Sequence, residues 1–157
     1  MNIQKISVPE QFVISVEYTN AFVSDIPKIL PQAFGSLGAY IASKGIKLDK
    51  PPFVIYRGVD VTGKETPFSF SFEVVFPLDK ELDTHGDVKG YYMPYMELAT
   101  TVYRGPYSQS APVYQALVKW VEENGYKYEE CAWETYLSGP EVPEKESITI
   151  ISIPITK

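Results

Sequence analysis

The chain repeats the order of its side chains, and this internal repeat is the feature that most constrains its fold. Residues between 34 and 56 recur 80 residues further along the chain. The offset is 85 upstream and 77 downstream, as expected where loops between matched elements differ in length. The repeat predicts two copies of one structural unit. The matched residues are Phe34 with Tyr114, Leu37 with Leu117, Tyr40 with Trp120, Gly45 with Gly125, Phe53 with Trp133, Tyr56 with Tyr136, Pro9 with Pro94, Tyr18 with Tyr103, and Phe76-Pro77 with Ile153-Pro154.

The first unit has the pattern of a strand, a helix and two further strands. Residues 12–18 alternate apolar and polar side chains, as a half-buried strand does. Residues 34, 37, 38 and 41 lie on one face of a helix. Pro31 is expected in its first turn and Gly45 at its exit, with Pro27 in a separate turn over 25–30. Strands are expected at 53–59 and 68–76, the second alternating Phe68, Phe70, Phe72, Val74 and Phe76.

The second unit repeats this order. Strands are expected at 95–103, 131–137 and 148–155. A helix lies between the first two, with Val113, Leu117, Trp120 and Val121 on its buried stripe. A charged stretch, 79–92, joins the units. A chain of 157 residues has the usual size of one domain. We therefore expect a single domain over 1–157, with pseudo-repeats at 1–78 and 93–157.

Strands outnumber helices in both units, which predicts an α+β fold. We expect an antiparallel sheet with both helices packed on one face. The other face then has no helix to cover it. If the units meet around a pseudo-twofold axis, that face becomes a central cleft, and interfaces between repeats favour ligand pockets.

Charge and composition narrow the range of possible binding partners. The formal net charge is −6 and the isoelectric point is near 4.8, whereas nucleic-acid binders carry a basic face. Direct nucleic-acid binding and attraction to an anionic membrane are therefore disfavoured. A cationic molecule or a basic protein surface suits the negative electrostatic field of the chain better. The apolar runs are too short for a membrane span or a signal peptide. With a single cysteine, Cys131, the chain is expected in the reducing cytoplasm.

Glu134 is the most informative polar residue. It lies mid-strand, where glutamate is uncommon. Alternation places it with Ala132 and Tyr136 on one face, with Trp133 and Leu137 on the other. If Trp133 and Leu137 pack under the helices, Glu134 faces the cleft, where a poorly hydrated carboxylate requires a cation or a hydrogen-bond donor. The alternative is an exposed glutamate on an edge strand.

Other sequence features give weaker indications of chemistry. Asp83, His85 and Asp87 could be metal ligands, but a glycine-containing charged loop without a second histidine is typical of a solvated segment. Cys131 is expected to be a packed, inert thiol. No phosphate-binding loop or serine nucleophile motif is present. We therefore expect neither a metal nor a cofactor.

Four motifs in the second unit resemble one known family. They are Tyr103-Arg104-Gly105-Pro106-Tyr107, Leu117-x-x-Trp120-x-x-x-x-Gly125-Tyr126, Glu134-x-Tyr136-Leu137-x-Gly139-Pro140, and Thr149-Ile150-Ile151-Ser152-Ile153-Pro154-Ile155. The chain thereby resembles the GyrI-like small-molecule-binding family, the effector-binding domain of multidrug-responsive transcription activators. Members often have histidine where this chain has Tyr103, which weakens any role for an imidazole here.

The resemblance implies two tandem modules around a central cavity. In such domains, a glutamate at the position of Glu134 contacts lipophilic, cationic aromatic compounds. Tyr136 is expected beside it and Tyr56 across the cleft, with Tyr18 and Tyr103 as further candidate binding residues. No residue is assigned to catalysis unless the protein is an enzyme, in which case the candidate is Glu134.

Three functions compete at this point. The first is a stand-alone receptor or sequestering protein for amphipathic, cationic aromatic compounds. No room for a DNA-binding helix-turn-helix is left before residue 12, so a transcriptional role would need a partner chain. The second, by resemblance, is a hydrolase of cyclopropane-containing aromatic toxins, in which Glu134 activates water with help from a tyrosine. The third is a protein that binds and inhibits a topoisomerase.

Overall fold

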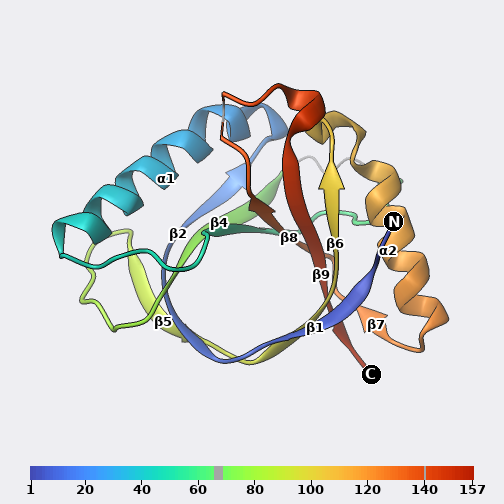
Figure 1. Ribbon diagram of the computed structural model, residues 1–157, viewed down its shortest axis with the longest axis horizontal. Coiled ribbons are helices and arrows are strands. Elements are labelled where there is room, and N and C mark those ends of the chain that lie inside the picture. Colours follow the sequence, from blue (N-terminus) through green and yellow to red (C-terminus); the bar gives the residue numbers. More distant parts are fainter. Residues whose placement is uncertain (66–68, 140) are drawn as a thin grey trace.

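The computed structural model describes residues 1–65, 69–139 and 141–157 of the chain. It confirms the α+β class, because each of two similar units contains one α-helix among several strands (Figure 1). The first unit contains β1 (Gln4–Val8), β2 (Gln11–Ala21), α1 (Ile26–Ser43), β3 (Phe53–Arg57) and β4 (Phe70–Leu78). The second contains β5 (Lys89–Met93), β6 (Met96–Arg104), α2 (Ala111–Glu123), β7 (Lys127–Tyr128), β8 (Cys131–Tyr136) and β9 (Ile148–Thr156).

Three short 3₁₀ turns complete the described elements: η1 (Val23–Asp25), η2 (Tyr107–Gln109) and η3 (Glu144–Glu146). Phe68, expected to open a strand, and Pro140, part of a family motif, lie outside the described residues.

The strands form one antiparallel sheet that joins the two units. Their order is β1-β6-β9-β8-β3-β4-β2-β5, with β7 paired to β9. The order is symmetric about the contact between β3 and β8. Each unit also lends its first strand to the other, because β1 pairs with β6 and β5 pairs with β2. The sheet is strongly curled, with the edge strands β1 and β5 curving round below β3 and β8 (Figure 1).

The sequence pattern did not predict β1 and β5. Both are five-residue edge strands, and most of their side chains are exposed. Short edge strands of this kind carry little apolar alternation. As a result, the last residues of the expected charged linker, 89–92, belong to β5.

Helix α1 is longer than expected. The prediction of a separate turn over 25–30 is wrong, because the helix begins at Ile26 and includes both Pro27 and Pro31. Pro27 occupies the first turn, where an N–H group has no partner within the helix. Pro31 removes only the hydrogen bond to the carbonyl of residue 27, near the helix start. Neither described helix is long and apolar enough to cross a membrane.

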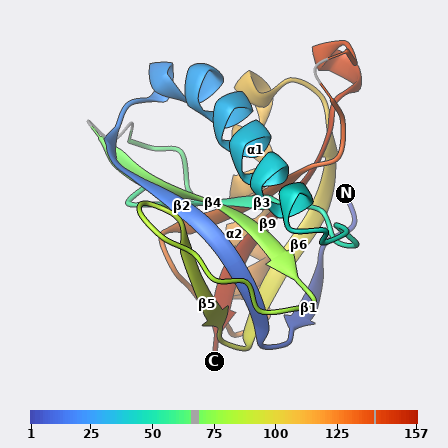
Figure 2. The ribbon, with the colours of Figure 1, turned by 90° about the vertical axis from the view of Figure 1, so that its left-hand side faces the viewer.

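The two helices bury matching residues against the same face of the sheet. In α1 these are Ala33, Leu37 and Ile41, and the residues 80 positions later are Val113, Leu117 and Val121. They pack in one core with residues of the central strands, including Val54, Tyr56 and Ala132. Figure 2 shows α1 running alongside β2 and β4 on this face.

The opposite face of the sheet has its own core. Phe53 and Trp133 stack at its centre, with ring centroids 4.8 Å apart and an angle of 11° between the rings. Val13, Val75, Met93 and Leu98 pack around them, because the curled sheet covers its own inner face. The prediction that Trp133 packs under the helices and that the cleft forms on the uncovered face of the sheet is therefore wrong. Trp133 does not lie under the helices, Leu137 is 50% exposed, and the uncovered face does not form the cleft.

Trp120 also departs from its predicted position. It is only half-buried at the margin of α2 and stacks on Tyr126, with centroids 6.3 Å apart. Leu117, one turn earlier, is fully buried.

This difference predicts unequal effects of truncating the two side chains. Leu117→Ala should lower the free energy of unfolding by about 2–5 kcal/mol, as cavity-forming changes do. Trp120→Ala should lower it by only about 1–2 kcal/mol, because the ring is only half-buried in the folded state. Urea unfolding of both variants measures the two losses. A loss for Trp120→Ala as large as that for Leu117→Ala would contradict the assigned burial.

Candidate functional site

A cavity of about 1180 Å³ lies on the helix-bearing face of the sheet. It is bounded by the N-terminal halves of α1 and α2 and by the centre of the sheet, where β3 meets β8. Its wall is mostly aromatic and aliphatic, and no lysine, arginine or histidine occurs among its described lining residues. Among the side chains that line it are Leu30, Phe34, Tyr56, Phe70, Phe76, Tyr107, Tyr114, Glu134 and Tyr136.

The repeat explains why aromatic rings surround the cavity. Phe34 of α1 and Tyr114 of α2 occupy matched positions, as do Tyr56 of β3 and Tyr136 of β8. Both pairs line the same cavity, one ring from each unit. The cavity therefore lies where the two units meet, as expected, but on the same side of the sheet as the helices.

Glu134 accepts hydrogen bonds from two tyrosines. The Tyr114 hydroxyl donates to Oε2, and the Tyr136 hydroxyl donates to Oε1 at 2.7 Å. The hydroxyls of Tyr56 and Tyr136 are 2.6 Å apart. Because Tyr136 directs its hydrogen to Glu134, Tyr56 must donate to the oxygen of Tyr136. The result is a chain of phenols that ends on the carboxylate.

Burial dominates the electrostatics of this cluster. It raises the pKa of Glu134 above the ordinary glutamate value, while the hydrogen bonds from Tyr114 and Tyr136 lower that pKa in part. The pKa values of Tyr56, Tyr114 and Tyr136 are raised by burial and by the charge of Glu134. The phenols therefore stay protonated and act as donors. The accessible part of Glu134 faces the cavity, so a bound molecule would meet the carboxylate directly.

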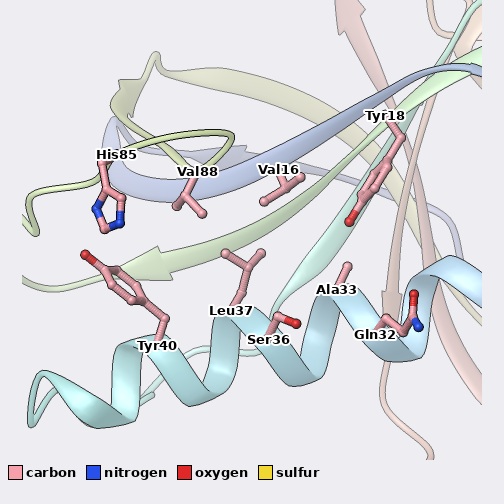
Figure 3. A pocket seen from close by; sticks show the side chains of 9 residues that line it. All are labelled: Val16, Tyr18, Gln32, Ala33, Ser36, Leu37, Tyr40, His85 and Val88. Carbon is pink, nitrogen blue, oxygen red and sulfur yellow. The ribbon is translucent and has the colours of Figure 1, made fainter.

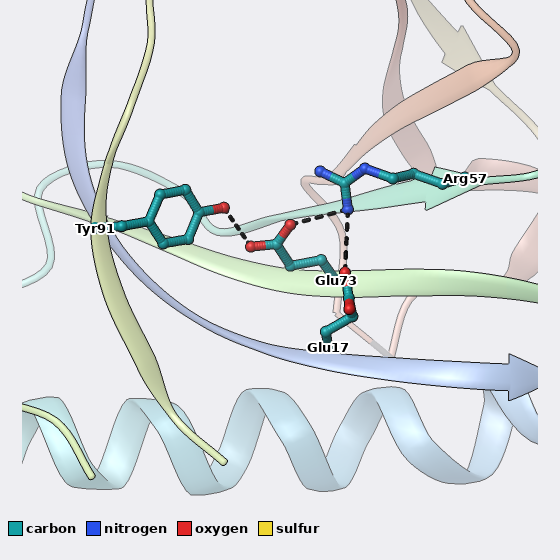
Figure 4. Close-up of polar contacts among 4 residues, drawn as sticks. All are labelled: Glu17, Arg57, Glu73 and Tyr91. Carbon is teal, nitrogen blue, oxygen red and sulfur yellow. Dashed lines mark hydrogen bonds and ion pairs between the residues drawn. The ribbon is translucent and has the colours of Figure 1, made fainter. Parts of the chain in front are cut away.

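A second carboxylate in the sheet shows what Glu134 lacks. Glu73 of β4 is 5% exposed and lies on the opposite face. It accepts a hydrogen bond from Arg57 at 3.0 Å and another from Tyr91, and Glu17 also approaches Arg57, at 3.7 Å (Figure 4). Glu73 thus has an internal cation. Glu134 has only phenol donors among the described residues, so its negative charge is not balanced.

The structure brings together three of the five predicted binding residues. Glu134, Tyr136 and Tyr56 all line the main cavity. Tyr18 lies on the far side of α1, in a smaller pocket. Tyr103 is not among the described lining residues of either cavity.

Tyr103 shapes the site indirectly. Its hydroxyl donates to the carbonyl of Pro106 at 2.7 Å and lies over Gly105, where a Cβ would approach this oxygen to 2.7 Å. The φ of Gly105 is +147°, a conformation that favours glycine. This closed turn precedes Tyr107, whose ring meets that of Tyr136 edge to face with centroids 5.5 Å apart. Tyr103 is therefore placed to support a wall of the cavity.

Sequence reasoning missed Tyr114, which donates directly to Glu134, as well as Tyr107 and Phe34. The repeat held a signal for two of them, because it aligns Phe34 with Tyr114 and Tyr56 with Tyr136. Positions that match across a twofold axis lie on the same surface of both units. The other sequence candidates offer no competing chemistry: burial raises the pKa of the Cys131 thiol to about 11. Within the described chain no three His, Cys, Asp or Glu side chains gather as metal ligands.

Comparisons with solved structures agree with this architecture. The C-terminal domain of EcmrR superposes with a TM-score of 0.77 at 23% identity, covering 99% of this chain and 98% of that domain. In the EcmrR–DNA complex, the chain spans 57% of the EcmrR chain, with a TM-score of 0.78. A hydrolase encoded by lin2189 of Listeria innocua gives 0.72 at 15% identity, covering 98% and 91% of the two chains. SAV2435 bound to tetraphenylphosphonium gives 0.62 at 11% identity, covering 99% and 94%.

These likenesses establish the fold, and the sequence establishes the family. No curated protein sequence matches the chain. The model of the GyrI-like small-molecule-binding domain matches residues 1–156, nearly the whole length. With a cavity at the junction of its two repeats, the chain belongs to the GyrI-like small-molecule-binding domain family.

Proposed function

We propose that the protein binds amphipathic aromatic molecules that carry a positive charge, in the cavity around Glu134. The observation that carries this proposal is a desolvated carboxylate that receives two phenol hydrogen bonds but faces no cation among the described residues. A bound cation would supply the missing charge.

The wall of the cavity suits the rest of such a ligand. Tyr56, Phe34, Tyr107 and Tyr136 present ring faces or edges to the cavity. A cation over an aromatic ring gains about 0.5–2 kcal/mol, with the larger value in desolvated sites. A volume of about 1180 Å³ accommodates a molecule of several rings. The expected ligand is therefore large, apolar over most of its surface, and cationic.

Two structural neighbours are consistent with this role. SAV2435 has been solved with tetraphenylphosphonium, an aromatic cation, and EcmrR has been solved on DNA. By analogy, this chain would sense or sequester its ligand. Inhibition of a topoisomerase stays a prediction that no described contact favours.

Replacing Glu134 by glutamine tests the proposal. Glu134→Gln keeps the size of the side chain and removes its charge. Affinity for a cationic dye should fall by about 1.5–3 kcal/mol, the range for bonds to charged groups, while a neutral dye of the same shape should bind nearly as before. Titration of both dyes by fluorescence, at two pH values, measures the difference. Equal losses for the two dyes would make Glu134 a structural residue and remove the basis of the proposal.

The pH dependence of the same binding has a definite sign. The pKa of Glu134 in the empty cavity is raised, and a bound cation favours the ionised form. Binding should therefore release a proton, and cation affinity should fall by about tenfold per pH unit below the raised pKa. The neutral dye serves as the internal control, since its affinity has no such dependence.

Tyr114→Phe provides a second test of the network. The Tyr114 hydroxyl lowers the pKa of Glu134, so its removal should raise that pKa further and shift the pH midpoint of cation binding upward. Carboxyl ¹³C chemical shifts of labelled glutamate follow the titration directly. Tyr95→Phe removes an exposed phenol outside the cavity and should leave the midpoint unchanged. An unshifted midpoint in Tyr114→Phe would show that this hydrogen bond does not form in solution.

A hydrolase is the second candidate function. A carboxylate with a raised pKa beside three phenols has the character of a general base next to acid groups, and one structural neighbour is a hydrolase. Incubation with a cyclopropane-containing aromatic compound, followed by mass spectrometry, separates the candidates. Formation of a product one water heavier, lost in Glu134→Gln, would favour the enzyme. Saturable binding without a product favours the receptor.

A further inference from the structure

A second cavity, of about 400 Å³, lies on the other side of α1 (Figure 3). Val16 of β2 and Val88 form one aliphatic wall, and Leu37 of α1 faces them from the other side. Tyr18 stands at one end, with Tyr40 and His85 at the other. Helix α1 separates this second cavity from the main one: Ala33 and Leu37 line the former, while Leu30 and Phe34 line the latter.

The two repeats differ at this place. The second unit carries larger side chains at two of the matched positions, with Val113 for Ala33 and Trp120 for Tyr40. Trp120 also stacks on Tyr126, which holds the ring in place. Smaller residues at these positions leave more space between helix and sheet in the first unit. The second cavity is therefore lined in part by side chains that the second repeat does not share.

Tyr18 supplies a positioned donor in the second cavity. Its ring stacks on Phe72, with centroids 5.0 Å apart and an angle of 25°. Its hydroxyl points towards α1 (Figure 3) and has no hydrogen bond to the described residues. The equivalent hydroxyl of Tyr103 donates to the carbonyl of Pro106. Of these two matched tyrosines, Tyr18 has its hydrogen available to a ligand.

The remaining polar groups indicate what kind of ligand fits. The Tyr40 hydroxyl already donates to the carbonyl of Asp83 at 2.6 Å, so its ring serves as a wall. No carboxylate is among the described lining residues, so a cation finds no counter-charge in the lining. The Asp87 charge also acts on the Tyr18 hydroxyl, which disfavours an anionic acceptor there.

We propose that the second cavity is a separate binding site for small, uncharged aromatic molecules that carry a hydrogen-bond acceptor, such as an aryl ketone. The ring lies between Leu37 on one side and Val16 and Val88 on the other. The carbonyl oxygen accepts the hydrogen of the Tyr18 hydroxyl. A volume of about 400 Å³ is at the small end for ligand sites and suits one or two rings. The site does not depend on Glu134 or on the ligand proposed for the main cavity.

Acetophenone and its isostere α-methylstyrene, in which a methylene group replaces the carbonyl oxygen, are the probes. Each is titrated into the ¹⁵N-labelled protein, and backbone amide shifts report where it binds. Acetophenone should produce saturable shifts at Val16, Tyr18, Leu37 and Val88, and these should persist in Glu134→Gln. Tyr18→Phe keeps the ring and removes the donor. It should weaken acetophenone by about threefold to tenfold and leave α-methylstyrene unchanged.

Two helix variants form a matched pair for blocking the second cavity. Ser36 and Ala39 are both exposed on α1, but only Ser36 is among the described lining residues. Ser36→Phe should abolish the saturable shifts, and Ala39→Phe should not. Three results would overturn the proposal: no saturable shift up to the solubility limit, shifts confined to Tyr114 and Glu134 in the main cavity, or undiminished binding to Ser36→Phe.

Discussion

The pairing of β3 with β8 is the interaction on which the rest of the structure depends. It joins two four-stranded halves into one sheet, with Ile55 opposite Trp133 and Tyr56 opposite Ala132. On one face it stacks Phe53 on Trp133, and on the other it brings the hydroxyls of Tyr56 and Tyr136 within 2.6 Å. Both contacts join residues that match in the repeat. The same register therefore fixes a dry core on one side and a phenol pair on the other.

The site arises where the repeat is broken. Val54 and Glu134 are matched residues and are also direct partners across β3 and β8. Two carboxylates in these positions would face each other, which is unfavourable for adjacent strands and would drive one of them to stay protonated. With valine on one side, the junction of β3 and β8 presents a single carboxylate to the cavity, and the tyrosines of both units contribute to its hydrogen-bond network. A symmetric fold thus produces an asymmetric site.

The offset of 80 predicted most of the architecture because it records side chains that the twofold axis brings to equivalent places. It located both helices, six of the strands and the pairing of Tyr56 with Tyr136. Alternation alone could not assign the faces of β8. Trp133 and Glu134 lie on opposite faces either way, and the curl of the sheet, not the helices, buries Trp133. The pairing of β1 and β5 with strands of the opposite unit was not predictable, because a strand with little apolar alternation does not specify which strand it pairs with. Tyr114 was missed since an apolar helix stripe does not show which ring reaches a carboxylate.

The carboxylates of Glu73 and Glu134 show how folding and binding are linked. Arg57 balances Glu73 within the fold. Glu134 is left with phenols, and its pKa is raised by burial. A group of this kind stabilises the folded state fully below the ordinary glutamate pKa, and that contribution is lost as the pH rises through the raised pKa. At neutral pH the ionised Glu134 therefore makes an unfavourable contribution to the free energy of folding of the empty protein. A cationic ligand would offset this unfavourable contribution when it binds, whereas a neutral ligand would not. The desolvation of one side chain thus lowers the stability of the empty protein and, for the same reason, underlies the proposed preference of the main cavity for positive charge.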